Sequence, residues 1–215
     1  MPEQLLVFHE NNFQTICDQL ARKDAGLKAI IREYGYPPMW TRPNRFQSLV
    51  LFILEQQVSL AAAYAAFKKL REKIGYVTPA KILAMTDEEM RAVYFTRQKM
   101  GYARELASAI QSRKLILKQL KSLPDEEVRS QMIPLKGIGH WTIDVYLMHA
   151  LQRTDLLPLG DIALVNSLKL IKQLPPHITK DEMLAIADAW RPNRTIAAML
   201  LWHAYIQRKG IVISH

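Results

Sequence analysis

Apolar residues recur every three to four positions along most of the chain, which is the period of an amphipathic helix. The apolar–polar alternation that is typical of strands is hard to find. The pattern therefore predicts an all-α protein with short loops between its helices. We expect helices over residues 12–34, 43–56, 59–74, 86–93, 98–112, 124–132, 140–151, 161–173, 179–190 and 193–208.

Two proline-rich places divide this helical pattern, residues 36–43 and the pair Pro175-Pro176. We expect a central helical subdomain over residues 43–173 and a second one formed by both chain ends, residues 1–42 plus 174–215. A cleft between two such subdomains is a common place for a site. We therefore expect a compact multi-helix fold with a cleft between the two subdomains.

The chain of 215 residues carries 29 Lys and Arg against 20 Asp and Glu, a formal net charge of +9. Such an excess favours a polyanionic partner, although an anionic membrane surface or simple solubility would also account for it. The single cysteine, Cys17, excludes a disulfide framework and a four-cysteine iron–sulfur cluster, and the six histidines form no zinc-ligand spacing. With no secretory signal peptide or membrane-length apolar run, we expect an intracellular protein.

One segment, Ile-Pro-Leu-Lys-Gly-Ile-Gly-His-Trp-Thr at residues 133–142, joins two predicted helices through a glycine-rich turn. Gly137 and Gly139 let another backbone approach, and amides at the start of the next helix can hold an anion such as a DNA phosphate. A Gly-x-Gly turn between helices is also common without any function. Seven basic residues against one acidic residue between Arg97 and Lys121 favour the phosphate interpretation, although a charged run is usually a solvated face.

Asp161 follows Gly160 and directly precedes an apolar helical pattern, which is the position of an N-cap. Capping alone would explain an aspartate there. One carboxylate oxygen can nevertheless cap the helix while the other faces a site, so a catalytic role stays open.

The hairpin LKGIGHWT, followed about twenty residues later by LLPLGD, resembles the helix-hairpin-helix superfamily of DNA glycosylases. The blocks REYGYPPMWTRPNRFQSLVLFILEQQVSLAAA, FTRQKMGYARELA and WRPNRTIAAMLLW are similar to its alkylpurine branch, the 3-methyladenine glycosylases of type II, in the same order. The resemblance implies an all-α glycosylase fold with the helix-hairpin-helix at about residues 124–151, in a minimal form without an N-terminal β-rich domain.

The resemblance also implies roles for individual residues. Asp161 falls on the catalytic aspartate, and Gln57 on the residue that wedges into the duplex when a nucleotide is flipped out. Trp141 and Trp202 fall near the base pocket. The phosphate-holding positions are Gly137, Gly139, Thr142 and Lys136, and the main-chain carbonyls expected around a possible Na⁺ or K⁺ are those of Ile133, Leu135 and Ile138.

From this resemblance we expect a monofunctional glycosylase that hydrolytically releases alkylated purines such as 3-methyladenine, and possible further bases are 7-methylguanine, ethenoadenine and hypoxanthine. A glycosylase/lyase would use a lysine two residues after the second hairpin glycine, where this chain has Trp141. A non-catalytic DNA-binding or damage-sensing module is the alternative from another class. We expect a monomer that binds damaged double-stranded DNA in the nucleoid or nucleus, with no required cofactor, no iron–sulfur cluster and no zinc.

Structural roles compete with these assignments at several positions. Trp190 reads as core, and Trp202 lies in an apolar run that would also be core. Gln57 would equally suit a solvated helix end. Asp144, on the second hairpin helix, is expected to pair with a nearby Lys or Arg.

Overall fold

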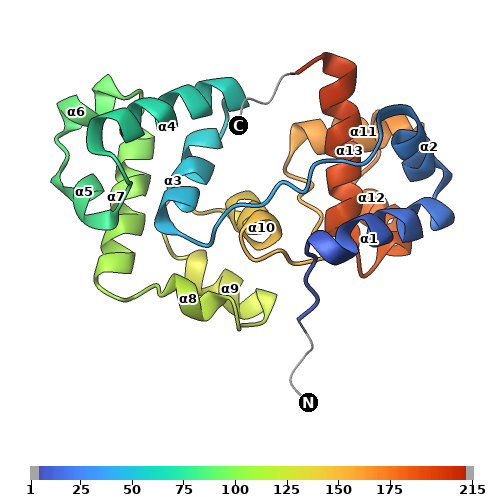
Figure 1. The fold of residues 1–215 in the computed structure, drawn as a ribbon, viewed down its shortest axis with the longest axis horizontal. Coiled ribbons are helices and arrows are strands. Elements are labelled where there is room, and N and C mark those ends of the chain that lie inside the picture. Colours follow the sequence, from blue (N-terminus) through green and yellow to red (C-terminus); the bar gives the residue numbers. More distant parts are fainter. Residues whose placement is uncertain (1–4, 212–215) are drawn as a thin grey trace. The chain divides into compact units, whose positions relative to one another are not determined.

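A computed structural model describes residues 5–211, which form an all-α fold without a β-sheet (Figure 1). An isolated bridge between Val7 and Arg153 is the one β-type pairing among these residues. The prediction of an all-α protein is confirmed. The helices are α1 (Glu10–Lys23), α2 (Ala25–Tyr34), α3 (Phe46–Glu55), α4 (Leu60–Ile74), α5 (Pro79–Ala84), α6 (Asp87–Ala92), α7 (Arg97–Gln111), α8 (Leu117–Leu120), α9 (Asp125–Met132), α10 (His140–His149), α11 (Ile162–Ile171), α12 (Lys180–Ala187), the 3-10 helix η1 (Asp188–Trp190) and α13 (Arg194–Lys209).

The described chain divides into two compact units. The central unit comprises residues 42–146, and the terminal unit comprises residues 5–41 together with 147–211. We expected residues 147–173 in the central subdomain, but they belong to the terminal unit. The physical reason is that α11 packs along α13, where the Ser167 hydroxyl donates a hydrogen bond of 2.6 Å to the Leu201 carbonyl.

Helix α3 supplies the core of the central unit. Its residues from Leu49 to Leu54 are all buried, and a helix that is apolar on every side is stable only inside a protein. It packs against α4 and α7, and α5 packs along α7. The short helices α5 and α8 were not predicted, since six and four residues are too few to establish a helical period.

Helix α13 supplies the core of the terminal unit, with Ile196 to Leu201 buried and α11, α2 and α1 packed around it. No helix of the described part of the chain is long and apolar enough to cross a membrane.

The helix predicted over residues 12–34 is interrupted at Asp24. Its carboxylate Oδ1 accepts the amides of Gly26 at 2.9 Å and Leu27 at 3.2 Å, so the residue caps α2. Its Oδ2 accepts hydrogen bonds of 2.7 Å from the Lys172 ammonium and from the indole of Trp190. Trp190 is fully buried, which confirms its assignment to the core.

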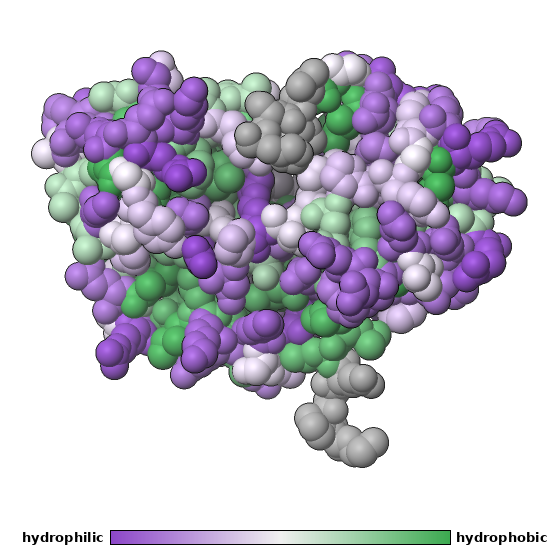
Figure 2. Space-filling view, viewed as in Figure 1, coloured by the Kyte–Doolittle hydropathy of each residue, from purple (hydrophilic) through white to green (hydrophobic). Residues whose placement is uncertain are grey.

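An open, largely apolar hollow of about 520 Å³ lies on the central unit around the end of α7 and α8. Apolar side chains gather there at the lower left of Figure 2, among hydrophilic ones. The arginines Arg45 and Arg113 belong to its lining, together with the aromatic side chains of Phe46 and Tyr76.

Candidate active site

Asp161 caps α11, as its position in the sequence predicts. Its Oδ1 accepts the amide of Leu164 at 2.9 Å and the indole Nε1–H of Trp202, on α13, at 3.1 Å. Two N–H donors on one oxygen fix the orientation of the carboxylate. The structure thus brings together two of the predicted site residues, Asp161 and Trp202.

Trp202 is itself held by an aromatic cluster within the terminal unit. The ring of His149 stacks on the Trp202 indole with centroids 5.7 Å apart and planes 26° apart. His149 Nδ1 lies 2.6 Å from the carbonyl oxygen of Trp40, whose indole lies 6.4 Å from the ring of His203. Sequence reasoning missed His149, because a histidine in a buried helical pattern is most often a core residue.

The loop that carries Asp161 is fastened to the beginning of α13. Arg194 Nε donates to Asp155 Oδ1 at 2.8 Å, and Arg191 Nη1 donates to Asp155 Oδ2 at 2.7 Å. The Leu156 amide donates to the Thr195 hydroxyl at 3.0 Å. Trp202 lies two turns further along α13. The bonds between the loop and this helix therefore hold Asp161 and Trp202 in position relative to each other.

In the central unit, the turn between α9 and α10 is closely approached at Gly137, but by a side chain of the same unit where we expected room for another backbone. Gly137 has a φ of 89°, and a Cβ atom there would lie closer than 3.0 Å to the ring of Tyr102 on α7. The Tyr102 hydroxyl in turn hydrogen-bonds the side-chain amide of Gln98. Gly137 is therefore required by the packing of the turn itself.

Gly139 differs from Gly137, since a Cβ atom there would meet no atom within 4 Å. It lies on the exposed side of the turn, as does Lys136. The Ile143 amide donates to the Gly139 carbonyl at 3.0 Å, so the N-terminus of α10 lies at this turn. An ammonium and a helix N-terminus are thus exposed beside the same turn.

Gln56 fastens this turn to the end of α3, a contact that sequence reasoning missed. Its Nε2 donates to the Gly137 carbonyl at 2.8 Å and to the Thr142 hydroxyl at 2.9 Å. Thr142 is buried, so its side chain serves this internal contact, and its main-chain amide remains the predicted phosphate donor. The sequence offers no signal that separates Gln56 from Gln57.

Gln57 is exposed and has a φ of 57°, in the left-handed region that a residue other than glycine seldom adopts. Two contacts brace the end of α3 just before it. Arg42 Nη1 donates to Glu55 Oε2 at 2.8 Å, and Lys99 Nζ donates to the Leu54 carbonyl at 2.6 Å. Burial lowers the pKa of the Lys99 ammonium.

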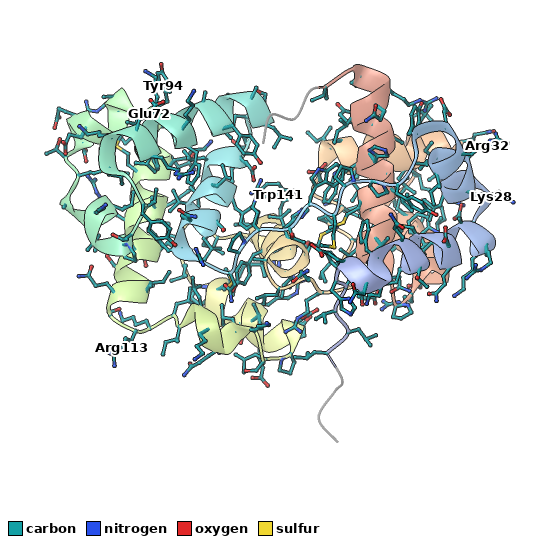
Figure 3. All side chains as sticks on the ribbon, viewed as in Figure 1. Lys28, Arg32, Glu72, Tyr94, Arg113 and Trp141 are labelled. Atoms are coloured by element: carbon teal, nitrogen blue, oxygen red, sulfur yellow. The ribbon has the colours of Figure 1, made fainter. Side chains whose placement is uncertain are left out.

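The basic segment of residues 97–121 contributes less exposed charge than its sequence predicts. Lys99 caps α3, and Arg104 binds Asp87 Oδ1 at 2.6 Å. The exposed members include Arg97 and Arg113, and Figure 3 shows Arg113 projecting outward at the end of α7. Two of its seven basic residues are therefore engaged in contacts within the protein.

Asp144 pairs with a basic residue as expected, since Arg129 Nη2 lies 2.6 Å from its Oδ1. Burial raises the pKa of Asp144 above its ordinary value, and the neighbouring Arg129 only partly opposes this. Trp141, on the same helix, is half-buried at its second position (Figure 3).

No cluster of three or more His, Cys, Asp or Glu side chains suited to a metal ion occurs within residues 5–211. The hairpin carbonyls are a different kind of ligand, since they are neutral oxygens. The Leu135 carbonyl accepts the Ile138 amide at 3.0 Å and keeps a second lone pair. This donor chemistry fits a monovalent cation and does not fit zinc.

Comparison with known proteins assigns the chain to a family. The family model described as "HhH-GPD superfamily base excision DNA repair protein" matches residues 50–192. DNA-3-methyladenine glycosylase 1 of Schizosaccharomyces pombe is 31% identical over 172 residues, covering 75% of this chain and 75% of that protein. A DNA-3-methyladenine glycosylase of Bacillus subtilis is 27% identical over 207 residues, covering 91% and 68%.

A solved structure is also similar, that of 3-methyladenine DNA glycosylase from Schizosaccharomyces pombe in complex with abasic DNA. Its TM-score is 0.81 at 28% sequence identity, and the match covers 87% of this chain and 95% of the other.

Proposed function

Since this chain belongs to the HhH-GPD superfamily of base excision DNA repair proteins, we propose that it is a monofunctional DNA glycosylase that releases alkylated purines by hydrolysis. The observation that carries the proposal is the carboxylate of Asp161, held on one oxygen by the Leu164 amide and the Trp202 indole. A structural cap needs only the first of these two donors. The second comes from another helix and fixes the direction in which the carboxylate points.

The reaction places positive charge on the deoxyribose as the glycosidic bond breaks. The charge of Asp161 stabilises that transition state, and the carboxylate can also orient or deprotonate the attacking water. An alkylated purine already carries positive charge, so it leaves readily and is attracted to aromatic faces. Trp202 and Trp141 are the residues we propose for contact with the flipped base.

DNA binding would rest on the hairpin. The N-terminus of α10 and the exposed ammonium of Lys136 suit a backbone phosphate, a contact that does not depend on the base sequence. Gln57, in its exposed loop, would fill the gap that the flipped nucleotide leaves. Flipping a nucleotide out of the duplex costs stacking free energy, and this cost is smallest for damaged bases. The protein would accordingly act on double-stranded DNA, in the nucleoid or nucleus.

We propose that the carbonyls of Ile133, Leu135 and Ile138 hold Na⁺ or K⁺, which would lend positive charge to the phosphate site. Replacing K⁺ by choline at equal ionic strength then weakens binding to abasic-site DNA. Equal affinity in the two salts would contradict the cation proposal while leaving the glycosylase proposal intact.

A panel of duplex oligonucleotides tests the function, each with one lesion among 3-methyladenine, 7-methylguanine, ethenoadenine and hypoxanthine. Release of free base with formation of abasic sites supports the proposal. Asp161→Asn keeps an oxygen for the Leu164 and Trp202 donors, so it should bind DNA like the wild type and release no base. If every duplex is bound and none loses its base, the protein is a binding module.

Treatment with borohydride during the reaction tests the monofunctional mechanism, because a lyase would form a Schiff base that borohydride traps. We expect no covalent adduct, since Trp141 stands at the lysine position of lyases. A trapped adduct would refute this part of the proposal.

A further inference from the structure

We propose that His149 is a positioning residue for base release, acting through Trp202 on the carboxylate of Asp161; this inference rests on the proposed function. The three side chains come from α10, from α13 and from the cap of α11. All of them lie in the terminal unit, together with Trp40.

The contact with Trp40 indicates which ring nitrogen of His149 donates. A carbonyl oxygen can only accept, so the 2.6 Å contact requires His149 Nδ1 to carry the proton. This hydrogen bond holds the ring against rotation about its side-chain bonds. The other nitrogen, Nε2, is then an acceptor in the neutral ring.

The held ring in turn limits the movement of Trp202. His149 and Trp202 stack with planes 26° apart, so tilting the indole toward α10 would collide with the imidazole. The indole Nε1–H is directed at Asp161 Oδ1, 3.1 Å away. A rotation of the indole would lengthen this hydrogen bond and would remove one of the N–H donors that orient Oδ1, another being the Leu164 amide.

The contact between His149 and Trp202 differs from ordinary core packing because it constrains the orientation of the rings as well as burying area. Core aromatics contribute mainly through buried area, and any ring of similar size preserves that contribution. His149 is only half-buried, and its Nδ1 is hydrogen-bonded to the Trp40 carbonyl. This bond fixes the orientation of the imidazole plane. The same plane aligns the donor to a reactive carboxylate, so the consequence should be measured in the rate of reaction.

The test is a double-mutant cycle on base release under single-turnover conditions. His149→Phe keeps a ring to stack and loses the bond to Trp40, and Trp202→Phe loses the indole donor to Asp161. We expect His149→Phe to slow release about three- to tenfold, the range of one hydrogen bond. In the Trp202→Phe background the same change should cost less than about twofold, because the donor it aligns is already gone.

Two readouts separate positioning from a loss of structure. The dissociation constant for abasic-site DNA should stay within about twofold of the wild type in His149→Phe, since binding does not need the aligned carboxylate. His177→Phe, at an exposed histidine of the same unit, is the control and should leave the rate unchanged. If His149→Phe does not fold, His149→Asn supplies a donor toward the Trp40 carbonyl and enters the same cycle.

Equal slowing by His149→Phe in both backgrounds would overturn the inference, as would a rate unchanged from the wild type. Both outcomes presuppose an active wild type. If the wild type releases no base from any lesion, the proposed function itself fails, so the two failures are distinguishable.

Discussion

The two hairpin glycines should fail in different ways when each is replaced by alanine. At Gly137, the φ of 89° places an L residue in a strained region, at a cost of about 1–3 kcal/mol. The added Cβ would also lie closer than 3.0 Å to the Tyr102 ring, and such overpacking costs about 1–3 kcal/mol more. Gly137→Ala should therefore reduce the free energy of unfolding by about 2–6 kcal/mol.

Gly139→Ala should leave stability nearly unchanged, because the added Cβ meets no atom within 4 Å. Its methyl group would instead stand on the exposed side of the turn, where the DNA backbone is proposed to approach. We expect weaker binding to abasic-site DNA with an unaltered unfolding curve.

Urea denaturation and fluorescence anisotropy with abasic-site DNA measure the two effects. Gly101→Ala serves as the control, since Gly101 lies inside α7 with open space at its Cβ. It should stabilise by about 0.5–1 kcal/mol and leave binding unchanged. The reasoning is refuted if Gly137→Ala unfolds like the wild type, or if Gly139→Ala loses stability and retains full affinity.

Three further predictions concern stability and burial within each of the two units. Burial would raise the pKa of Asp24, but hydrogen bonds to its charged form lower it overall, so its stabilisation is present above about pH 3.8 and is lost as the pH falls through the lowered value. Asp24→Asn should therefore flatten the acid limb of the stability curve followed by fluorescence, whereas Asp181→Asn, at an exposed aspartate, should leave it unchanged. Burial raises the pKa of the Cys17 thiol to about 12, so Ellman's reagent should find no reactive thiol in the native protein and one in urea; a rapid native reaction would contradict this burial. Gln56→Ala removes both bonds to the hairpin and should lower the free energy of unfolding by about 1–3 kcal/mol in urea, an effect that an unchanged midpoint would disprove.

Helical periodicity predicted most of the fold because it depends on which face of each helix is buried, and a sequence records that directly. The capping box at Thr86 is an example of such a local signal, with the Glu89 amide 3.2 Å from the Thr86 hydroxyl and Glu89 Oε2 accepting the Thr86 amide. The break at Asp24 was missed, because its apolar pattern continues across the interruption. The bonds that stabilise the break come from Lys172 and Trp190, far along the chain.

The candidate site was predictable to the extent that it follows local rules. The cap position of Asp161 is such a case, whereas the approach of the Tyr102 ring to Gly137 was not predicted. The contacts made by Gln56 and His149 connect segments separated by 81 and 109 residues, respectively. Such contacts depend on how helices pack, and no spacing in the sequence reports them.

The hydrogen bonds of Gln56 also set the distance between two proposed DNA contacts of the central unit. Gln57 follows Gln56 directly, and Gln56 is hydrogen-bonded to the turn that contains Gly137, so the proposed wedge residue and the turn proposed to hold a phosphate are fastened together. When both contacts bind a duplex, the distance between them must match the distance from the opened gap to a backbone phosphate. Damaged DNA would then be recognised by its dimensions before any base is inspected.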